Sequence, residues 1–369
     1  MNKTRNAIGL SIVLFLTLIA CVQQPEAVIS ELESKPIASV NSSFEFQKGV
    51  AYTSWWKGEY SSQASDSTIE EAIKPLGANW ISVVVTCYQK NEKSTEIRCK
   101  PDSKTPTNDD LVHVINFIHD QGIKVMLKPH VNISHDDQTW RGQIGFQDDE
   151  AAWQAWFESY TEFITHYANL AQENQVDYFV VGTELGKTSH RTDQWRTVIK
   201  EVRNLYNGPL TYAANWDEVF EVDWWDDLDA IGVDAYFPLT NKAEPTIAEL
   251  KEAWEPIVFH LGQLSRRWDL NIILTEIGYR SIDGTNQRAY AATQDLNINL
   301  QEQADCYQAV FEAFSGQDWW EGVFWWNWST DPNQGGPKDG DFTAHNKPAE
   351  NVLRENYGAS LRDLSYSNP

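Results

Sequence analysis

Basic residues and cysteines are scarce in this chain, and no long apolar run follows its first twenty residues. Lysine and arginine number 29 against 53 aspartates and glutamates, which gives a formal net charge of −24. So acidic a surface argues against nucleic acids and anionic polymers as partners. It favours a neutral substrate, or a salty medium in which the charge is screened. Because no later stretch is apolar enough to cross a bilayer, membrane attachment is expected only through the N-terminus.

The four cysteines do not form a metal-binding motif, because neither CxxC nor HExxH spacing occurs. No metal site is therefore expected. Cys87 and Cys99 bracket a polar loop after a predicted strand, and an oxidising compartment permits them to form a disulfide; two free thiols are the alternative. Cys306 lies within a helical pattern and is expected to be a buried free thiol.

The first twenty residues predict a bacterial lipoprotein signal peptide. Two basic residues precede an apolar stretch too short to span a bilayer, and the segment Leu18-Ile19-Ala20-Cys21 resembles a lipobox. Cleavage there would leave Cys21 as a lipid-bearing N-terminus, so the protein is expected to be exported and anchored to the cell envelope. An ordinary secretory signal with a chance cysteine is the alternative. Residues 21–43 lack a sustained apolar period and predict a flexible tether.

Residues 44–369 have the length and pattern of one (β/α)8 barrel, an α/β fold. Eight strand-like runs alternate with helical patterns. The runs are 48–55, 80–87, 124–131, 177–184, 210–215, 230–236, 271–277 and 322–328. The clearest helices are 67–76, 108–121, 150–173, 192–206, 247–268, 290–314 and 347–357. An open doubly wound sheet is the alternative, but the loop after the first run has no GxGxxG motif for phosphate.

Two glutamates stand alone at the ends of apolar runs. Glu184 ends the run YFVVGTE, and Glu276 ends the run NIILTE. A charge at the end of a buried strand is costly unless it is paired or used. Two carboxylates on different strands of one barrel are what a glycosidase needs, one as acid/base and one as nucleophile. The alternative is that both are structural glutamates with salt-bridge partners.

Aromatic and amide residues follow the other strand-like runs. Since the carboxyl ends of barrel strands converge on one end of the barrel, here called the mouth, these residues are expected to line a site there. They are Trp55, Trp56, Tyr88, His130, Asn132, Asn215, Trp216, Asp234, Tyr236, Tyr279, Trp325, Trp326 and Trp328. Sugar rings present apolar faces that pack on aromatic side chains, while their hydroxyls need amides and carboxylates. For any single tryptophan, packing between helix and barrel is the alternative.

Four segments, 125–131, 181–185, 274–279 and 341–350, resemble glycoside hydrolase family 113. That family consists of retaining β-mannanases in the large barrel clan that carries its acid/base after strand four and its nucleophile after strand seven. The resemblance extends from about residue 48 to 357. Each motif is weak alone, but the four occur in order, and both glutamates fall on the strands that the clan requires.

The resemblance implies a role for each residue. Glu184 is expected to be the acid/base and Glu276 the nucleophile, with Tyr236 hydrogen-bonded to the nucleophile and Trp326 under the attacked sugar. A double displacement by these residues needs no metal and no organic cofactor. The substrate is expected to be a neutral β-linked oligo- or polysaccharide, and the protein is expected to be a monomer.

The chain departs from the wider clan at one position. Thr183 stands where many clan families have an asparagine that binds the sugar 2-hydroxyl, as a small residue does in family 113. Asn215 and His130 are the candidates to make that contact instead. Lys128 matches the family's Lys-Pro-His run and Trp140 its loop after the third strand, so both are expected to bind substrate.

Three functions remain open from the sequence. The first is an exported, lipid-anchored retaining β-1,4-mannanase. The second keeps the barrel and both glutamates but acts on a β-glucan or a xylan, because specificity depends on loop contacts that vary within a fold. The third is a surface lipoprotein that binds glycans without cleaving them. Two intact glutamates count against this third function, since a binding protein gains nothing from buried like charges.

Overall fold

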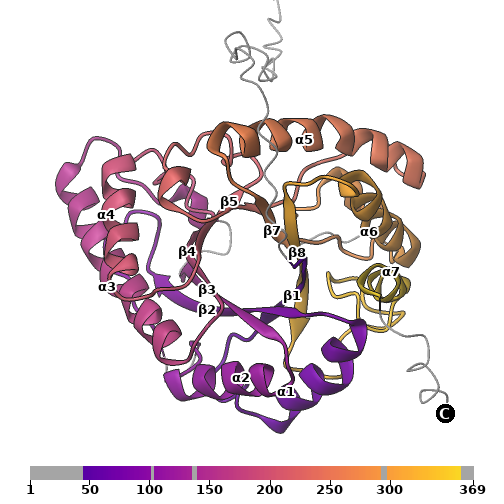
Figure 1. Cartoon of the computed structure of the whole chain (residues 1–369), viewed down its shortest axis with the longest axis horizontal. Coiled ribbons are helices and arrows are strands. Elements are labelled where there is room, and N and C mark those ends of the chain that lie inside the picture. Colours follow the sequence, from indigo (N-terminus) through magenta and orange to yellow (C-terminus); the bar gives the residue numbers. More distant parts are fainter. Residues whose placement is uncertain (1–44, 101–103, 135–138, 292–296, 359–369) are drawn as a thin grey trace, which may run out of the picture. The chain divides into compact units, whose positions relative to one another are not determined.

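The computed structural model describes residues 45–100, 104–134, 139–291 and 297–358. In this part of the chain eight parallel strands form a closed barrel in the order β1 to β8, seen end-on in Figure 1. They are β1 (Gln47–Thr53), β2 (Trp80–Gln89), β3 (Lys124–Ile133), β4 (Tyr178–Thr183), β5 (Leu210–Asn215), β6 (Ile231–Asp234), β7 (Ile272–Ile277) and β8 (Trp320–Ser329). The expected single (β/α)8 barrel is confirmed.

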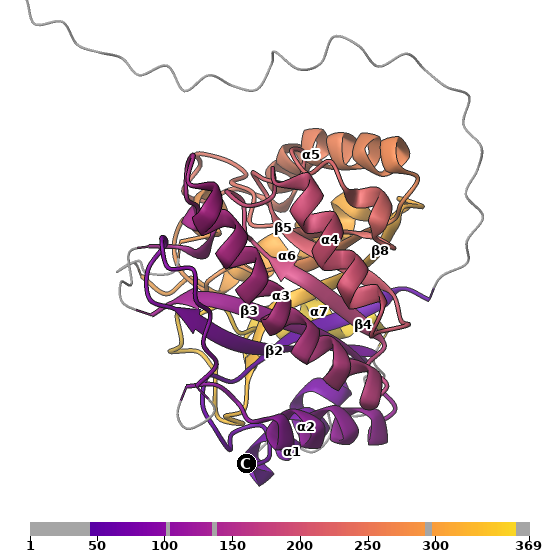
Figure 2. The ribbon, with the colours of Figure 1, turned by 90° about the vertical axis from the view of Figure 1, so that its left-hand side faces the viewer.

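Helices surround the barrel on its outside (Figures 1 and 2). They are α1 (Gln63–Ser67), α2 (Asn108–Asp120), α3 (Glu150–Glu173), α4 (Thr192–Arg203), α5 (Ile247–Trp268), α6 (Leu300–Phe314) and α7 (Pro348–Tyr357). Capping boxes begin two of them, in which Thr107 pairs with Asp110 and Thr246 with Glu249. Each box satisfies backbone N–H groups that the first turn of a helix leaves unpaired. None of the helices in the described ranges is both long and apolar enough to cross a membrane.

The strands are apolar on both faces because each face is covered. Every residue of β4, β5, β6 and β7 is buried. Outward-facing side chains pack against the helices, and a smaller inner cluster fills the barrel. The inner cluster consists of Trp80, Met126, Tyr178, Val180, Ala213, Ala230, Ile273 and Phe324. Gly49 is required beside it, because a Cβ there would lie 2.3 Å from the Phe324 ring.

Some helix boundaries differ from those expected. The helix expected over 290–314 begins only at Leu300, where the Asn299 side chain accepts a hydrogen bond from the Glu302 N–H. The expected helix over 67–76 is instead a π-helix, Thr68–Ile73, followed by a 3-10 turn, Lys74–Leu76. The signal peptide, Cys21 and the tether lie outside the described residues, so those expectations remain predictions.

Candidate active site

Glu276 is held by hydrogen bonds at both carboxylate oxygens. It lies in β7, is only 4 % exposed, and pairs in register with Asp234 of β6. Lys128 Nζ donates to Glu276 Oε1 at 2.6 Å, and Tyr236 Oη donates to Oε2 at 2.9 Å. Burial, followed by the charge of Glu276, holds the pKa of Tyr236 well above its usual range. The phenol therefore keeps its proton and remains a donor, so the carboxylate is fixed in one orientation.

Lys128 joins Glu276 to a second acid. Its Nζ also donates to both oxygens of Asp234, at 2.9 and 3.1 Å, and Thr275 Oγ1 donates to Asp234 Oδ1 at 2.8 Å. The side chains of Lys128 and Asp234 are fully buried. Burial and the neighbouring Glu276 charge hold the pKa of Asp234 well above its usual range. Lys128 and Asp234 were expected to bind substrate; they lie instead beneath the site and hold Glu276.

Glu184 follows β4 directly and lies in a different environment. Its backbone has φ +53°, an uncommon left-handed conformation for a residue other than glycine. Trp140 Nε1 and Arg141 Nη1 donate to Glu184 Oε2, at 3.0 and 3.1 Å. Burial raises the pKa of Glu184 above its usual range; Arg141 opposes that shift, and the charge of Glu276 adds to it. The environment therefore favours the protonated form of Glu184.

His130 and Asn132 share the inner face of β3 with Lys128. His130 Nε2 lies 3.6 Å from Glu276 Oε1. Burial, and then the charges of Arg141 and Lys128, hold the pKa of His130 well below its usual range, so its imidazole is neutral. Asn132 Oδ1 accepts two hydrogen bonds from Arg141, at 3.0 and 2.7 Å. Asn132 thus orients the guanidinium that reaches Glu184.

Aromatic side chains lie at the carboxyl ends of β1, β5 and β8 and in the loop after β3. Trp326 of β8 lies parallel to the His130 ring at 6.5 Å and packs against Trp55 at 6.4 Å. Trp55 is 37 % exposed and Trp140 is 39 % exposed, so both retain surface for a ligand. Trp216, after β5, stacks on the exposed Tyr290 at 6.2 Å. Trp55 and Trp140 therefore have accessible surface of the kind that sugar rings require.

Asn215 ends β5 beside the mouth and is buried. Its side-chain amide donates to Asp217 Oδ1 at 2.6 Å. The amide is therefore held in place at a strand end, on the strand next to β4. Its oxygen remains a candidate partner for a sugar hydroxyl.

The prediction was wrong for three aromatic residues. Trp325, Trp328 and Tyr279 belong to the core between barrel and helices and are at most 1 % exposed. Trp325 stacks on Tyr307 of α6 at 3.8 Å. A register shift between β1 and β8 pairs both Trp325 and Trp328 with outward-facing residues. Of the three tryptophans, Trp326 alone stays partly exposed, beside His130. These three side chains have no surface for a sugar.

Sequence reasoning missed Arg141 and Glu218. Arg141 lies beside Trp140, which was expected in the site, but nothing in the sequence distinguishes it from a solvated loop arginine. Glu218 is buried after β5, and burial raises its pKa to about 7. The only signal was its position three residues after the strand-end Asn215.

Cys87 and Cys99 form a disulfide with a Cα–Cα separation of 4.3 Å, as predicted. It ties the end of β2 to the loop that follows. Cys306 is a buried free thiol, also as predicted.

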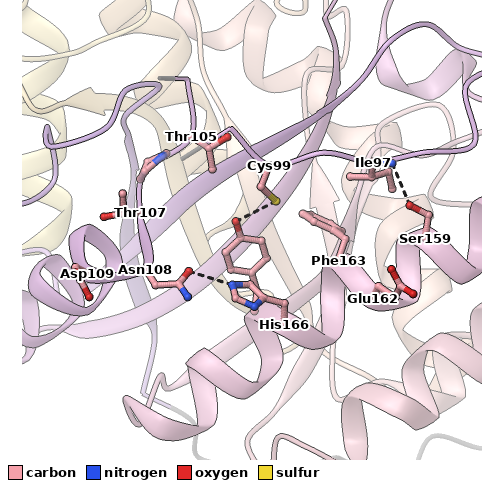
Figure 3. A pocket seen from close by; sticks show the side chains of 12 residues that line it. Ile97, Cys99, Thr105, Thr107, Asn108, Asp109, Ser159, Glu162, Phe163 and His166 are labelled. Atoms are coloured by element: carbon pink, nitrogen blue, oxygen red, sulfur yellow. Dashed lines mark hydrogen bonds between the residues drawn. The ribbon is translucent and has the colours of Figure 1, made fainter. Parts of the chain in front are cut away.

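A surface pocket of about 570 Å³ lies beside this disulfide, on the outside of the barrel (Figure 3). It is lined by residues 97, 99 and 105–107 between β2 and α2, by the start of α2 and by α3, and it contains none of the residues expected to bind substrate. Its polar groups bond to one another: Ile97 N–H to Ser159 Oγ at 3.0 Å, and His166 Nε2 with Asn108 Oδ1 at 3.0 Å. These contacts hold the loop against the helix.

A closed (β/α)8 barrel with two differently held glutamates, on β7 and directly after β4, defines an enzyme with its site at the carboxyl ends of the strands. The sequence model of Glycoside Hydrolase Family 113 matches residues 51–347. The chain therefore belongs to this family and is an O-glycosyl hydrolase.

Solved structures agree with the family assignment. A GH113 β-1,4-mannanase in a complex is 29 % identical, with a TM-score of 0.78 over 86 % of this chain and 100 % of its own. The GH113 β-mannanase AaManA from Alicyclobacillus acidocaldarius, in complex with ManMIm, is 27 % identical, with a TM-score of 0.77 over 86 % of this chain and 98 % of its own. A Ruminococcus gnavus β-glucuronidase shares the fold at 12 % identity, with a TM-score of 0.58 over 85 % of this chain and 50 % of its own. No curated protein sequence matches the chain.

Proposed function

We propose that the chain cleaves β-1,4-linked mannan or mannooligosaccharides by double displacement with retention of configuration. The observation that carries the proposal is the unlike environment of the two glutamates. Glu276 receives a hydrogen bond at each oxygen, whereas both hydrogen bonds that Glu184 receives from described residues reach Oε2. This leaves Glu184 Oε1 to carry a proton toward a leaving group.

The reaction follows from the fixed orientation of Glu276 and from a protonated Glu184. Glu184 protonates the glycosidic oxygen while Glu276 attacks the anomeric carbon, and the bond to the leaving sugar breaks. The loss of its proton leaves Glu184 as the base that activates water. That water then hydrolyses the bond between the sugar and Glu276, which returns both residues to their starting states. The proposal requires carboxyl oxygens about 5 Å apart, as in retaining glycosidases.

One observation supports mannan as the glycan, and two more support a neutral glycan in general. The GH113 structures described above are β-mannanases, one of them specified as a β-1,4-mannanase. The chain carries a net charge of −24, which suits a neutral polymer better than an anionic one. Trp55 and Trp140 offer exposed aromatic surface, and Trp140 donates a hydrogen bond to Glu184. A β-glucan or a xylan would use the same catalytic residues.

A substrate screen tests the function. Soluble mannan, glucomannan, xylan and mixed-linkage glucan are incubated with the protein, and new reducing ends are measured. Cleavage of mannan and glucomannan is expected. Cleavage of xylan or mixed-linkage glucan alone would move the substrate to another β-glycan. Binding of a glycan with no release from any of them would favour the non-catalytic alternative.

Azide separates the roles of the glutamates. In Glu276→Ala hydrolysis should be abolished, and azide should attack from the vacated side to give a glycosyl azide of inverted configuration. In Glu184→Ala the glycosyl-enzyme still forms on Glu276 when the leaving group is good, so azide should give a product of retained configuration. The anomeric configuration of each product is read by NMR. Exchanged outcomes would reverse the two assignments.

We further propose that the mature protein begins at Cys21 and is anchored through lipid on that cysteine to the bacterial envelope. The lipobox-like segment supports this proposal. Cells fed labelled palmitate should incorporate it into the wild-type protein and not into Cys21→Ser. Equal labelling of the two would refute the anchor.

A further inference from the structure

Glu218 is a buried acid that the proposed reaction does not use. It lies in the turn after β5, where its N–H and that of Val219 donate to the Asn215 carbonyl. The side chain is 4 % exposed, so it has almost no surface for substrate. Burial raises its pKa to about 7, although hydrogen bonds from Tyr212 and from the Asn215 N–H oppose that shift. A buried carboxyl is costly, so its partners indicate what it does.

Those partners connect Glu218 to the residue after the acid/base. Tyr212 Oη donates to Glu218 Oε1 at 2.6 Å and accepts the Leu185 N–H at 2.8 Å. Glu218 Oε2 accepts the Asn215 N–H at 3.1 Å. Because a phenol has one proton, its donation to Glu218 turns its lone pairs toward Leu185. The carboxyl therefore fixes the direction in which Tyr212 accepts.

The peptide group that Tyr212 holds, between Glu184 and Leu185, adjoins a strained backbone position at Glu184. Glu184 has φ +53°, a conformation that costs energy in a residue with a Cβ and persists only when its surroundings enforce it. The Glu184 N–H donates to the Ala213 carbonyl at 2.8 Å, and the next N–H, of Leu185, is the one that Tyr212 holds. Both peptide groups around Glu184 are thus bonded to β5.

We propose that Glu218 and Tyr212 are positioning residues that hold Glu184 in its acid/base orientation through the Leu185 peptide. This inference rests on the proposed function. Neither residue touches the substrate. Loss of the Tyr212 hydroxyl would free the Leu185 N–H, and the Glu184 backbone would relax toward a more common conformation. A displacement of about 1 Å in a catalytic group can cost about 100-fold in rate.

The test compares Tyr212→Phe with Tyr160→Phe. Tyr160 is a matched control, since its buried hydroxyl donates at 2.7 Å to the Val181 carbonyl, within β4 but away from the Glu184–Leu185 peptide. For each variant kcat/KM is measured on the polysaccharide that the wild type cleaves and on an aryl glycoside of the same sugar. The polysaccharide needs a proton from Glu184, whereas an aryl substrate with a good leaving group does not.

Tyr212→Phe should lose about 10- to 100-fold on polysaccharide and less than threefold on the aryl glycoside. Tyr160→Phe should lose equally little on both substrates. Glu218→Gln can still accept from Tyr212, so it should retain more polysaccharide activity than Glu218→Ala. Equal losses on the two substrates, or the same selective loss in Tyr160→Phe, would overturn the inference. An inactive wild type would overturn the proposed function and this inference with it, whereas uniform losses in an active enzyme overturn the inference alone.

Discussion

Substitution of Lys128 by methionine tests whether the cluster under the site acts as a unit. Lys128 is fully buried and donates at 2.6 to 3.1 Å to both Glu276 and Asp234. Methionine keeps most of the apolar stem and removes the charge. Removal of one partner from a buried ion pair typically costs about 3–5 kcal/mol, because the remaining charge stays buried. We expect Lys128→Met to lose that much free energy of unfolding.

The assay is urea unfolding at pH 7, followed by tryptophan fluorescence. Lys124→Met is the matched control on the same strand, because Lys124 is exposed: its ammonium pairs with Glu45 at 3.4 Å and lies 5.4 Å from the centre of the Trp80 ring. It should change stability by less than about 1 kcal/mol. In the double variant Lys128→Met/Asp234→Asn, one of the two buried carboxylates that Lys128 contacts is also removed. The double loss should therefore be smaller than the sum of the single losses by about 2 kcal/mol.

The same substitution should alter the pH dependence of catalysis. Without the ammonium, Asp234 and Glu276 face each other, and the pair will bind a proton at higher pH. The acidic limb of kcat/KM, which requires the nucleophile to be ionised, should move up by at least about one pH unit. An unchanged acidic limb together with additive stability losses would refute the view that Lys128, Asp234 and Glu276 act as a unit.

Three further outcomes follow from the contacts described. Arg141→Met should move the basic limb of the pH profile upward, since Arg141 opposes the raised pKa of Glu184 and its removal lets the acid keep its proton longer. Glu218 has a folded-state pKa of about 7 against an ordinary 4.5, so its contribution to stability is complete below pH 4.5 and is lost as pH rises through 7. Relative to Glu218→Gln, the free energy of unfolding of the wild type, measured with urea, should fall by about 3 kcal/mol across that window. Replacement of Cys87 and Cys99 by serine should cost about 3 kcal/mol in the same assay, because the bond closes a short loop.

Each of these outcomes has a control. Arg191→Met removes an arginine paired with Glu150 at 2.9 Å, outside the site, and should leave the basic limb in place. A parallel pH dependence of wild type and Glu218→Gln would contradict the raised pKa. The cysteine variant should match the wild type measured in reductant, so a stability equal to that of the oxidised wild type would show that the disulfide does not contribute.

The barrel and its two glutamates could be predicted because they depend on local patterns. An apolar run that ends in a lone carboxylate is visible in one sequence, and alternation with helices implies parallel strands. This pattern alone predicts that Glu184 and Glu276 lie at the ends of buried strands. The hydrogen bond from Tyr236 to Glu276 was also expected, but from resemblance to the family and not from the run itself.

The inward or outward direction of side chains at the end of β8 could not be predicted. Strict alternation places Trp326 and Trp328 on one face, yet the register shift between β1 and β8 places Trp328 with Trp325 in the outer core. A bulge of this kind depends on the neighbouring strand and leaves no mark in the run itself. The start of α6 was also mispredicted. The residues before Asn299 continue the apolar pattern of the helix, but the helix begins only after Asn299, whose side chain caps it.

The unlike roles that we propose for the two glutamates agree with where their hydrogen-bond donors come from. Lys128 lies in β3 and Tyr236 two residues after the end of β6; both are buried and donate to Glu276. Trp140 and Arg141 come from the loop after β3 and reach Glu184 from the exposed side. A nucleophile must stay ionised and fixed, and donors buried in or directly beside the strands are held in place by the surrounding core. An acid/base must alternate between two protonation states, and donors on a loop can adjust to both while one oxygen remains directed at the substrate.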